Sequence, residues 1–389
     1  MAFRTHHFTA AGPQIKARPP LHGIQKSSVL AEIGNKLRCQ NVEDDQRRPL
    51  KPVNVTNPTR KPLKGVENDV VCLTQTLKSV SINDAAPLPV QEKQLVTKEE
   101  SSYSSTLYNI QDIDKESAND IIFNGEYAKD IFEYLRSLEV KYALRPNFLC
   151  GTVTPRMRLV LVDWLFDVQL QFSLLSETMF LAVAIIDRYL QKVHIIDKKK
   201  IQLLGAASLL VASKYEETYP PEISNFVYIC SNLYTKTEIL RMEGQIMKTL
   251  DFFIGYPLSV HFLRRYSKAS SPDEVTYTLA KYFQEMCLME YELCHIAPSR
   301  LAAAALYLAL WLRSKSDTSP IWSETLIYYS QYKLKDIADI AKKIALAVMN
   351  IESAKYQALY QKYSRSKFLK VSILPEVAPA HLKKMLKFL

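Results

Sequence analysis

The sequence is poor in glycine and lacks a long apolar run, and each absence excludes a class of protein. With nine glycines in 389 residues, it offers no obvious place for the Gly-rich loop that cradles the phosphates of a nucleotide. Its longest apolar run, Leu301 to Leu312, has about twelve residues, whereas a helix needs roughly twenty to cross a bilayer. No apolar signal-peptide core follows Met1. We therefore expect a buried core helix at this run, no membrane partner and no dinucleotide cofactor.

Metal-binding and catalytic patterns are also missing. The six cysteines include no CxxC pair, and no His/Cys set completes a zinc site. No nucleophile–base signature is present, so we expect no metal, no cofactor and no catalytic residue. This cysteine usage fits a reducing, intracellular compartment. The net charge of +10 would suit acidic partners or nucleic acid. Basic residues are spread along the chain without a recognition motif, however, so we expect no nucleic acid.

The N-terminal part of the chain has the composition of a disordered tail. Residues 1 to about 105 hold nine of the nineteen prolines and no tryptophan, and they show no apolar periodicity. Such a segment cannot bury enough apolar surface to offset the entropy lost on ordering. We therefore expect a disordered regulatory tail over residues 1–113.

Helical periodicity begins near Asp114. A leading amphipathic helix places apolar side chains on one face, namely Tyr127, Ile131, Tyr134, Leu135 and Leu138. Capping residues and first-turn prolines then mark a first set of helices. These run over about 155–172, 176–191, 197–215, a short helix from 221, and 235–250. A second set is expected over about 257–268, 273–294, 298–315, 323–330 and 334–351.

The two sets repeat the same order of features. In each, a long amphipathic helix leads to an alanine-rich helix that its neighbours can approach closely, and the offset is roughly one hundred residues. No strand alternation interrupts them. We therefore predict an all-α fold with two tandem five-helix domains, over 114–255 and 256–370. The disordered tail precedes them and a C-terminal extension over 371–389 follows.

Two stretches carry a family resemblance. Met157–Leu165 is apolar almost all round, and Leu210–Glu222 is a small-residue helix stopped by a double proline. Together they resemble the cyclin box. Similarity to the mitotic (G2/M) B-type cyclins rests on Leu30–Asn35, Arg241–Glu243 and His261–Arg265. The resemblance covers residues 114–370 and implies two tandem cyclin-box domains.

The resemblance implies a regulatory subunit rather than an enzyme. Cyclins bind and activate a cyclin-dependent serine/threonine protein kinase, and the B type controls the G2/M transition. Lys214 and Glu243 match a pair that lies close together in cyclins and contacts the kinase beside its mobile C-helix. The apolar part of that contact corresponds to Val211, Tyr215 (often Phe in the family), Met247, Ile254, Ile131 and Tyr134. Without the resemblance, Lys214 is a solvated cation at a helix C-terminus and Glu243 a solvated helix residue.

A second apolar stripe on the first cyclin-box helix predicts a docking site. Met157, Leu161 and Trp164 lie at i, i+4 and i+7, while other apolar residues of the helix already supply a core face. An exposed apolar patch with a tryptophan marks a docking site; the alternative is ordinary core. Cyclins carry a docking patch for substrates or inhibitors here. The matching positions are Met157, Val160, Leu161, Trp164, Asp167 (more often Glu in the family), Ile201 and Gln202.

Embedded charges suggest two further features. Arg158 and Asp187 lie in apolar helices, where a buried charge needs a partner; in the cyclin box these positions pair and brace the first two helices. Lys248, His261 and Arg265 are candidates for a phosphate site, because His261 and Arg265 share a helix face and B-type cyclins have an anion pocket at matching positions. The alternative for these three is a solvated basic helix end.

One island in the tail resembles the destruction box, which marks mitotic cyclins for ubiquitin-dependent degradation. Its candidate residues are Leu30, Ile33 and Asn35, with Ser27 where the pattern has Arg. A chance match is the alternative. The resemblance thus implies the ubiquitin ligase machinery as a further partner and residence in the nucleus and cytoplasm.

A rival function uses the same fold. A transcription-factor-IIB-like or retinoblastoma-like scaffold would bind nucleic acid or peptides through two five-helix domains. It would need a basic face in the second domain, and it would give Lys214 and Glu243 no role.

Overall fold

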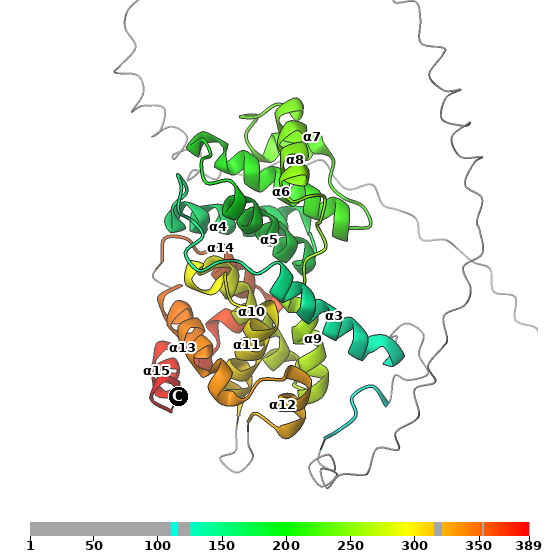
Figure 1. Cartoon of the computed structure of the whole chain (residues 1–389). Helices are drawn as coiled ribbons and strands as arrows, with labels where there is room; N and C mark the ends of the chain where they lie inside the picture. Colours follow the sequence, from blue (N-terminus) through cyan, green and yellow to red (C-terminus); the bar gives the residue numbers. More distant parts are fainter. Residues whose placement is uncertain (1–109, 116–124, 315–320, 352–353, 389) are drawn as a thin grey trace, which may run out of the picture. The chain divides into compact units, whose positions relative to one another are not determined.

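The computed structural model describes residues 110–115, 125–314, 321–351 and 354–388 (Figure 1). Within these ranges every regular element is a helix and none is a strand, as predicted. The candidate degron residues Leu30, Ile33 and Asn35 lie outside the described residues.

The leading helix and the first set of helices form where local sequence signals place them. A short 3-10 turn, η2 (Gly125–Tyr127), leads into α3 (Ala128–Lys141). The first bundle consists of α4 (Pro155–Phe172), α5 (Ser176–Lys192), α6 (Ile201–Glu216), α7 (Ile223–Ile229) and α8 (Lys236–Thr249). The Thr154 hydroxyl accepts a hydrogen bond from the N–H of Met157 at 3.3 Å, and Thr235 and Glu238 form the expected capping box. The third helix begins later than predicted, because Asp197 caps a separate 3-10 turn, η3 (Lys198–Lys200).

A second bundle and a C-terminal segment complete the described chain. The second bundle consists of α9 (Ser259–Ser270), α10 (Glu274–Met289), α11 (Pro298–Arg313), α12 (Glu324–Ser330) and α13 (Leu334–Ile351), with η4 (Tyr291–Leu293) after α10. The C-terminal segment contains α14 (Ala358–Tyr363), η5 (Ser366–Phe368), η6 (Val371–Ile373), η7 (Pro375–Val377) and α15 (Pro379–Phe388). Leu382 and Met385 of α15 are fully buried, and α15 packs on α11 and α13. The expected C-terminal extension is therefore part of the fold.

Each bundle is built around its small-residue helix. Helix α6 packs against α4, α5, α7 and α8, and α11 packs against α9, α10, α12 and α13. Residues 203–213 of α6 and 301–309 of α11 are buried without exception. A Cβ on Gly205 would lie 2.6 Å from Cδ1 of Leu161, so the absent side chain lets α4 lie directly on α6. Glycine and alanine at these positions are thus required by close helix packing.

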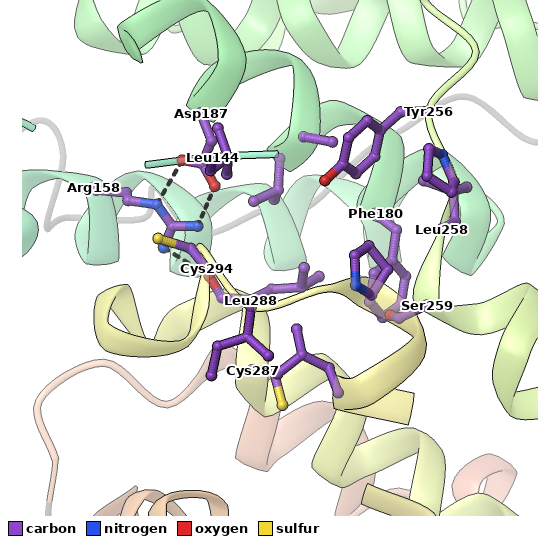
Figure 2. A pocket seen from close by; sticks show the side chains of 16 residues that line it. Leu144, Arg158, Phe180, Asp187, Tyr256, Leu258, Ser259, Cys287, Leu288 and Cys294 are labelled. Carbon is purple, nitrogen blue, oxygen red and sulfur yellow. Dashed lines mark hydrogen bonds and ion pairs between the residues drawn. The ribbon is translucent and has the colours of Figure 1, made fainter. Parts of the chain in front are cut away.

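The predicted buried pair Arg158–Asp187 is confirmed and reaches beyond the first bundle. Nε and Nη2 of Arg158 each donate to Asp187 at 2.7 Å, and Nη1 donates to the carbonyl of Leu288 at 2.8 Å. Figure 2 shows this pair at one side of a cavity of about 60 Å³ that residues of both bundles line. Such a cavity admits only a few water molecules and is well below the roughly 300 Å³ of a small-ligand site. Arg158 therefore braces the two bundles together.

Helix α3 is anchored to the second bundle. Nη2 of Arg136 donates to the carbonyl of Ser330 at 2.6 Å and to the Tyr266 hydroxyl at 3.0 Å. The Glu139 carboxylate accepts from the N–H and the hydroxyl of Ser299 at 2.5 and 2.8 Å. Burial raises the pKa of Glu139, and the hydrogen bonds from Ser299 oppose that rise. These contacts fix one face of α3, and its opposite face stays exposed.

Candidate functional site

Lys214 and Glu243 meet at the surface of the first bundle. Lys214 lies in the last turn of α6, Glu243 lies in the middle of α8, and these helices pack together. Nζ of Lys214 lies 2.6 Å from Oε1 of Glu243, with side chains 48% and 17% exposed. The two residues were predicted to lie close together, and the structure brings them together. Because Lys214 is half exposed, such a pair contributes little to stability, on the order of 1 kcal/mol.

Exposed apolar side chains also lie at the end of α6 and on α3. Tyr215 follows Lys214 and is 57% exposed, while Ile131 and Tyr134 on α3 are 45% and 59% exposed. The Tyr215 hydroxyl would lie 2.8 Å from a Cβ on Gly255, so glycine there leaves room for the tyrosine. Solvent-exposed aromatic side chains beside a charged pair are typical of a protein interface. We call Lys214, Glu243, Tyr215, Ile131 and Tyr134 the shelf surface.

Three other residues predicted for this contact lie deeper. Val211 and Ile254 are 5% and 6% exposed, and Met247 is half-buried. Val211 and Ile254 are buried within the first bundle, and their contact with a kinase stays a prediction.

Sequence reasoning missed Phe252. Its side chain is 67% exposed, and its N–H donates to the carbonyl of Met247 at 2.9 Å. Both Asp251 and Phe252 have positive φ, 53° and 58°. At this turn the side chains of the adjacent Phe252 and Phe253 take different environments. Phe253 instead stacks on Tyr142, with ring centroids 4.1 Å apart. The Phe-Phe pair was the only signal, and it could not show which ring points outward.

The predicted docking patch is only partly exposed. Leu161 and Trp164 are 3% and 7% exposed, and Ile201 is also buried. The prediction that this α4 stripe faces solvent is therefore wrong for Leu161 and Trp164, and Leu161 packs on α6 at Gly205. Docking at the matching positions stays a prediction. The more accessible members are Met157, Val160 and Gln202, which are half-buried, and Asp167, which is exposed.

The candidate phosphate site is not assembled as predicted. Arg265 is 10% exposed and both of its terminal nitrogens lie 2.5 Å from the carboxylate oxygens of Asp114. His261 is half-buried. Burial lowers its pKa most, and the charge of Arg264 lowers it further, so His261 is a poor anion ligand. Lys248 lies exposed in the last turn of α8. In this structure the chain supplies its own anion to Arg265, and a phosphate site at these three residues stays a prediction.

Other kinds of site have no counterpart in the described part of the chain. No group of three or more His, Cys, Asp or Glu side chains there could hold a metal ion. Among the same residues, no helix has the length and hydropathy to cross a membrane.

Comparisons with known proteins agree with this architecture. Residues 130–255 match the family described as cyclin, N-terminal domain, and residues 257–377 match cyclin, C-terminal domain. A G2/mitotic-specific cyclin-B of Patella vulgata is 47% identical over 277 residues, which cover 71% of this chain and 67% of the relative. A G2/mitotic-specific cyclin-B1 of Xenopus laevis is 36% identical over 377 residues, or 95% and 92%. A solved viral cyclin from herpesvirus saimiri aligns with a TM-score of 0.47 at 22% identity, over 55% of this chain and 97% of that one.

Proposed function

Because this chain belongs to the cyclin family, we propose that it binds and activates a cyclin-dependent serine/threonine protein kinase at the G2/M transition. It acts as a regulatory subunit and contributes no catalytic residue. Its similarity to G2/mitotic-specific B-type cyclins supports the mitotic assignment. The observation that carries the proposal is the Lys214–Glu243 pair, which lies at the surface with the exposed Tyr215 beside it.

The shelf surface acts by holding a mobile part of the kinase in place. Kinase activity requires a Glu of the C-helix to meet the Lys on strand β3 that positions the ATP phosphates. A cyclin surface that packs against the C-helix can keep it in that position only if the surface itself is rigid. Here α6 and α8 are packed in one bundle, and α3 is held by Arg136 and Glu139. The surface is therefore formed before the kinase binds, which lowers the entropy cost of association.

The test is a double substitution at the charged pair. Lys214→Ala with Glu243→Ala should abolish co-purification of the kinase and activation in a phosphorylation assay. Stability should change by less than about 1 kcal/mol, since the pair is exposed. The matched control is Lys343→Ala with Glu292→Ala, an exposed pair at 3.6 Å on the second bundle, which should keep kinase binding. Unchanged kinase binding by the Lys214/Glu243 variant would refute the placement.

The accessible part of the α4 patch extends the proposal to substrate choice. Met157, Val160 and Gln202 offer half-buried apolar and amide groups, and Asp167 adds an exposed carboxylate. This combination suits a short peptide with a basic and an apolar residue. Such peptides from substrates or inhibitors would dock here while the kinase site acts on another part of the same protein.

The tail supplies control of protein level in this proposal. A ubiquitin ligase would recognise Leu30, Ile33 and Asn35, in a chain that moves between nucleus and cytoplasm. Deleting residues 1–100 should leave kinase activation intact and should stabilise the protein through mitotic exit, as measured by immunoblotting of synchronised cells. A full-length chain whose level stays constant through mitotic exit would remove the degron from the proposal.

A further inference from the structure

The short segment 110–115 is bound to the second bundle in the way that a protein binds a peptide. The N–H of Gln111 donates to the Thr325 hydroxyl at 3.3 Å, and the N–H of Ile113 donates to the Tyr329 hydroxyl at 3.2 Å. The side chain of Ile113 is 5% exposed. Thr325 and Tyr329 both belong to α12, so one short helix receives both backbone donors.

The anchor of this segment is the carboxylate of Asp114. Its two oxygens each lie 2.5 Å from a terminal nitrogen of Arg265 on α9, and Nζ of Lys268 lies 3.6 Å away. Burial alone would raise the pKa of Asp114, but the hydrogen bonds and charge of Arg265, with the charge of Lys268, outweigh it and lower the pKa. A two-pronged Arg–carboxylate contact is among the strongest and most directional polar contacts in proteins.

Two aromatic rings flank the guanidinium of Arg265 and orient it for an anion. Its guanidinium carbon lies 4.9 Å from the ring centroid of Tyr329 and 5.4 Å from that of Phe132. Phe132 belongs to α3, so the same arginine contacts α9, α12 and α3. Because these rings already restrict the side chain of Arg265, a ligand that binds it loses little further side-chain entropy.

The set of contacts selects a peptide over a simple anion. A free phosphate could use Arg265 and Lys268, but it has no apolar group for the buried position of Ile113 and no backbone N–H groups spaced as in Gln111 and Ile113. The site therefore matches a peptide that offers backbone N–H groups two residues apart and an apolar residue directly before an Asp. Peptide sites of this kind gain affinity from main-chain hydrogen bonds and specificity from side-chain positions.

We propose that α9 and α12 form a binding site for an acidic peptide in which an apolar residue precedes an aspartate, and that residues 110–115 of the chain occupy it in cis. A tethered ligand has a high effective concentration, so the site stays closed to peptides from other proteins until this segment is displaced. Because Arg265 also contacts Phe132, occupancy of the site helps to fix α3. This inference goes beyond kinase activation and does not depend on it.

The test uses the full-length chain and a fluorescent peptide of residues 110–115. In Asp114→Lys the cis segment is repelled by Arg265 and Lys268, so the site should open. We expect this variant to bind the peptide at least tenfold more tightly than the unaltered chain, as measured by fluorescence anisotropy. A peptide carrying Asp114→Asn should bind the variant at least tenfold more weakly. Hydrogen exchange at the amides of Gln111 and Ile113 should be at least tenfold faster in the variant.

The matched control is Asp112→Lys. Asp112 is exposed, and its carboxylate accepts a local hydrogen bond from the N–H of Asp114 at 2.9 Å. This control makes the same change of charge in the same segment, but it should keep slow exchange and exclude the peptide. If Asp114→Lys fails to fold, Asp114→Asn in the full chain replaces it with the same expected order of affinities. The proposal is overturned if the unaltered chain binds the peptide as tightly as Asp114→Lys does. It is also overturned if the amides of Gln111 and Ile113 exchange slowly in Asp114→Lys, or exchange fast there while the peptide does not bind.

Discussion

Single buried charges in this chain differ in how well a partner compensates for the loss of water. Burial alone would lower the pKa of Arg158, but the charge and hydrogen bonds of Asp187 outweigh burial and raise it. Asp163 has no such partner. Burial, with a contribution from the charge of Asp167, raises its pKa to about 6, although its carboxylate accepts from the N–H of Ala358 at 2.9 Å. Arg158 is therefore stable as an ion, whereas an ionised Asp163 costs stability.

The cost of ionising Asp163 gives a prediction about pH. An Asp in the unfolded chain has a pKa of about 3.9, so between about pH 4 and 6 the folded chain holds more protons. Stability from this residue is then present below about pH 4 and is lost as pH rises through 6. Asp163→Asn keeps an acceptor for Ala358 and cannot ionise. It should match the unaltered chain at pH 4 and exceed it by about 1 kcal/mol at pH 7, after allowance for partial exposure.

Urea unfolding at pH 4, 5.5 and 7 measures this difference. The comparison at pH 4 serves as the internal control, because the folded unaltered chain is then protonated at Asp163. A variant that is no more stable than the unaltered chain at pH 7 would contradict the assigned cost.

The sequence identified those residues whose chemistry is unusual for their position. Arg158 and Asp187 stand out because each interrupts an apolar helix, and the family resemblance pairs them, as it pairs Lys214 with Glu243. The resemblance assigned Val211 and Ile254 to the kinase contact, but it does not give the depth of a side chain, and both are buried here. Asp114 was missed as the partner of Arg265, because 151 residues separate the two and no local rule connects them.

At the scale of elements, helix starts with side-chain caps were the easiest to predict. Thr154 and Thr235 each mark a start through a hydrogen bond to a backbone N–H three residues on. The six-residue α14 and the ten-residue α15 were not predicted. Helices this short are unstable alone and form only when their apolar residues are buried by the rest of the fold. Their existence depends on packing that the local sequence does not encode.

Two Gly→Ala substitutions should change stability in opposite directions, because only one of the two glycines lies at the contact between α4 and α6. A Cβ on Gly205 would lie 2.6 Å from Cδ1 and 3.2 Å from Cγ of Leu161. Leu161 is buried and must shift, so Gly205→Ala should lower stability by about 1 kcal/mol even after the gain in helix propensity. Because α4 also carries Met157 and Val160 of the accessible patch, a shift at Leu161 should lower affinity for a docking peptide several-fold while kinase co-purification is retained.

Gly244→Ala provides the matched control on α8. A Cβ there meets nothing within 4 Å, so the substitution should raise stability by about 0.5–1 kcal/mol and leave docking unchanged. Thermal unfolding and peptide titration of both variants make the comparison. Equal stability changes in the two variants would mean that α4 does not require glycine at position 205.

At the scale of the whole described chain, contacts between residues far apart in sequence hold the leading helix α3 and the two bundles together. Arg158 of α4 reaches the carbonyl of Leu288, and Arg136 of α3 reaches that of Ser330. A third link is Lys362 of α14, which donates to Gln169 of α4 at 2.9 Å and to Glu285 of α10 at 2.6 Å. The order of helices was predictable from local patterns, but these links were not, because each joins residues at least 77 positions apart.

The link formed by Lys362 is deeply buried, so substitution of this lysine should lower stability by a large amount. Its side chain and that of Glu285 are 3% and 1% exposed, and burial lowers the pKa of Lys362 although the charge of Glu285 opposes this. Lys362→Met leaves Glu285 buried without its cation and should cost about 3–5 kcal/mol in urea unfolding. Lys362→Met with Glu285→Met should recover part of that loss, since an apolar pair needs no compensation. The control is Lys342→Met, where Nζ of Lys342 lies 3.8 Å from Oδ1 of Asp339 near the surface; it should lower stability by less than about 1 kcal/mol. Similar losses for Lys342→Met and Lys362→Met would show that the C-terminal segment does not join the bundles.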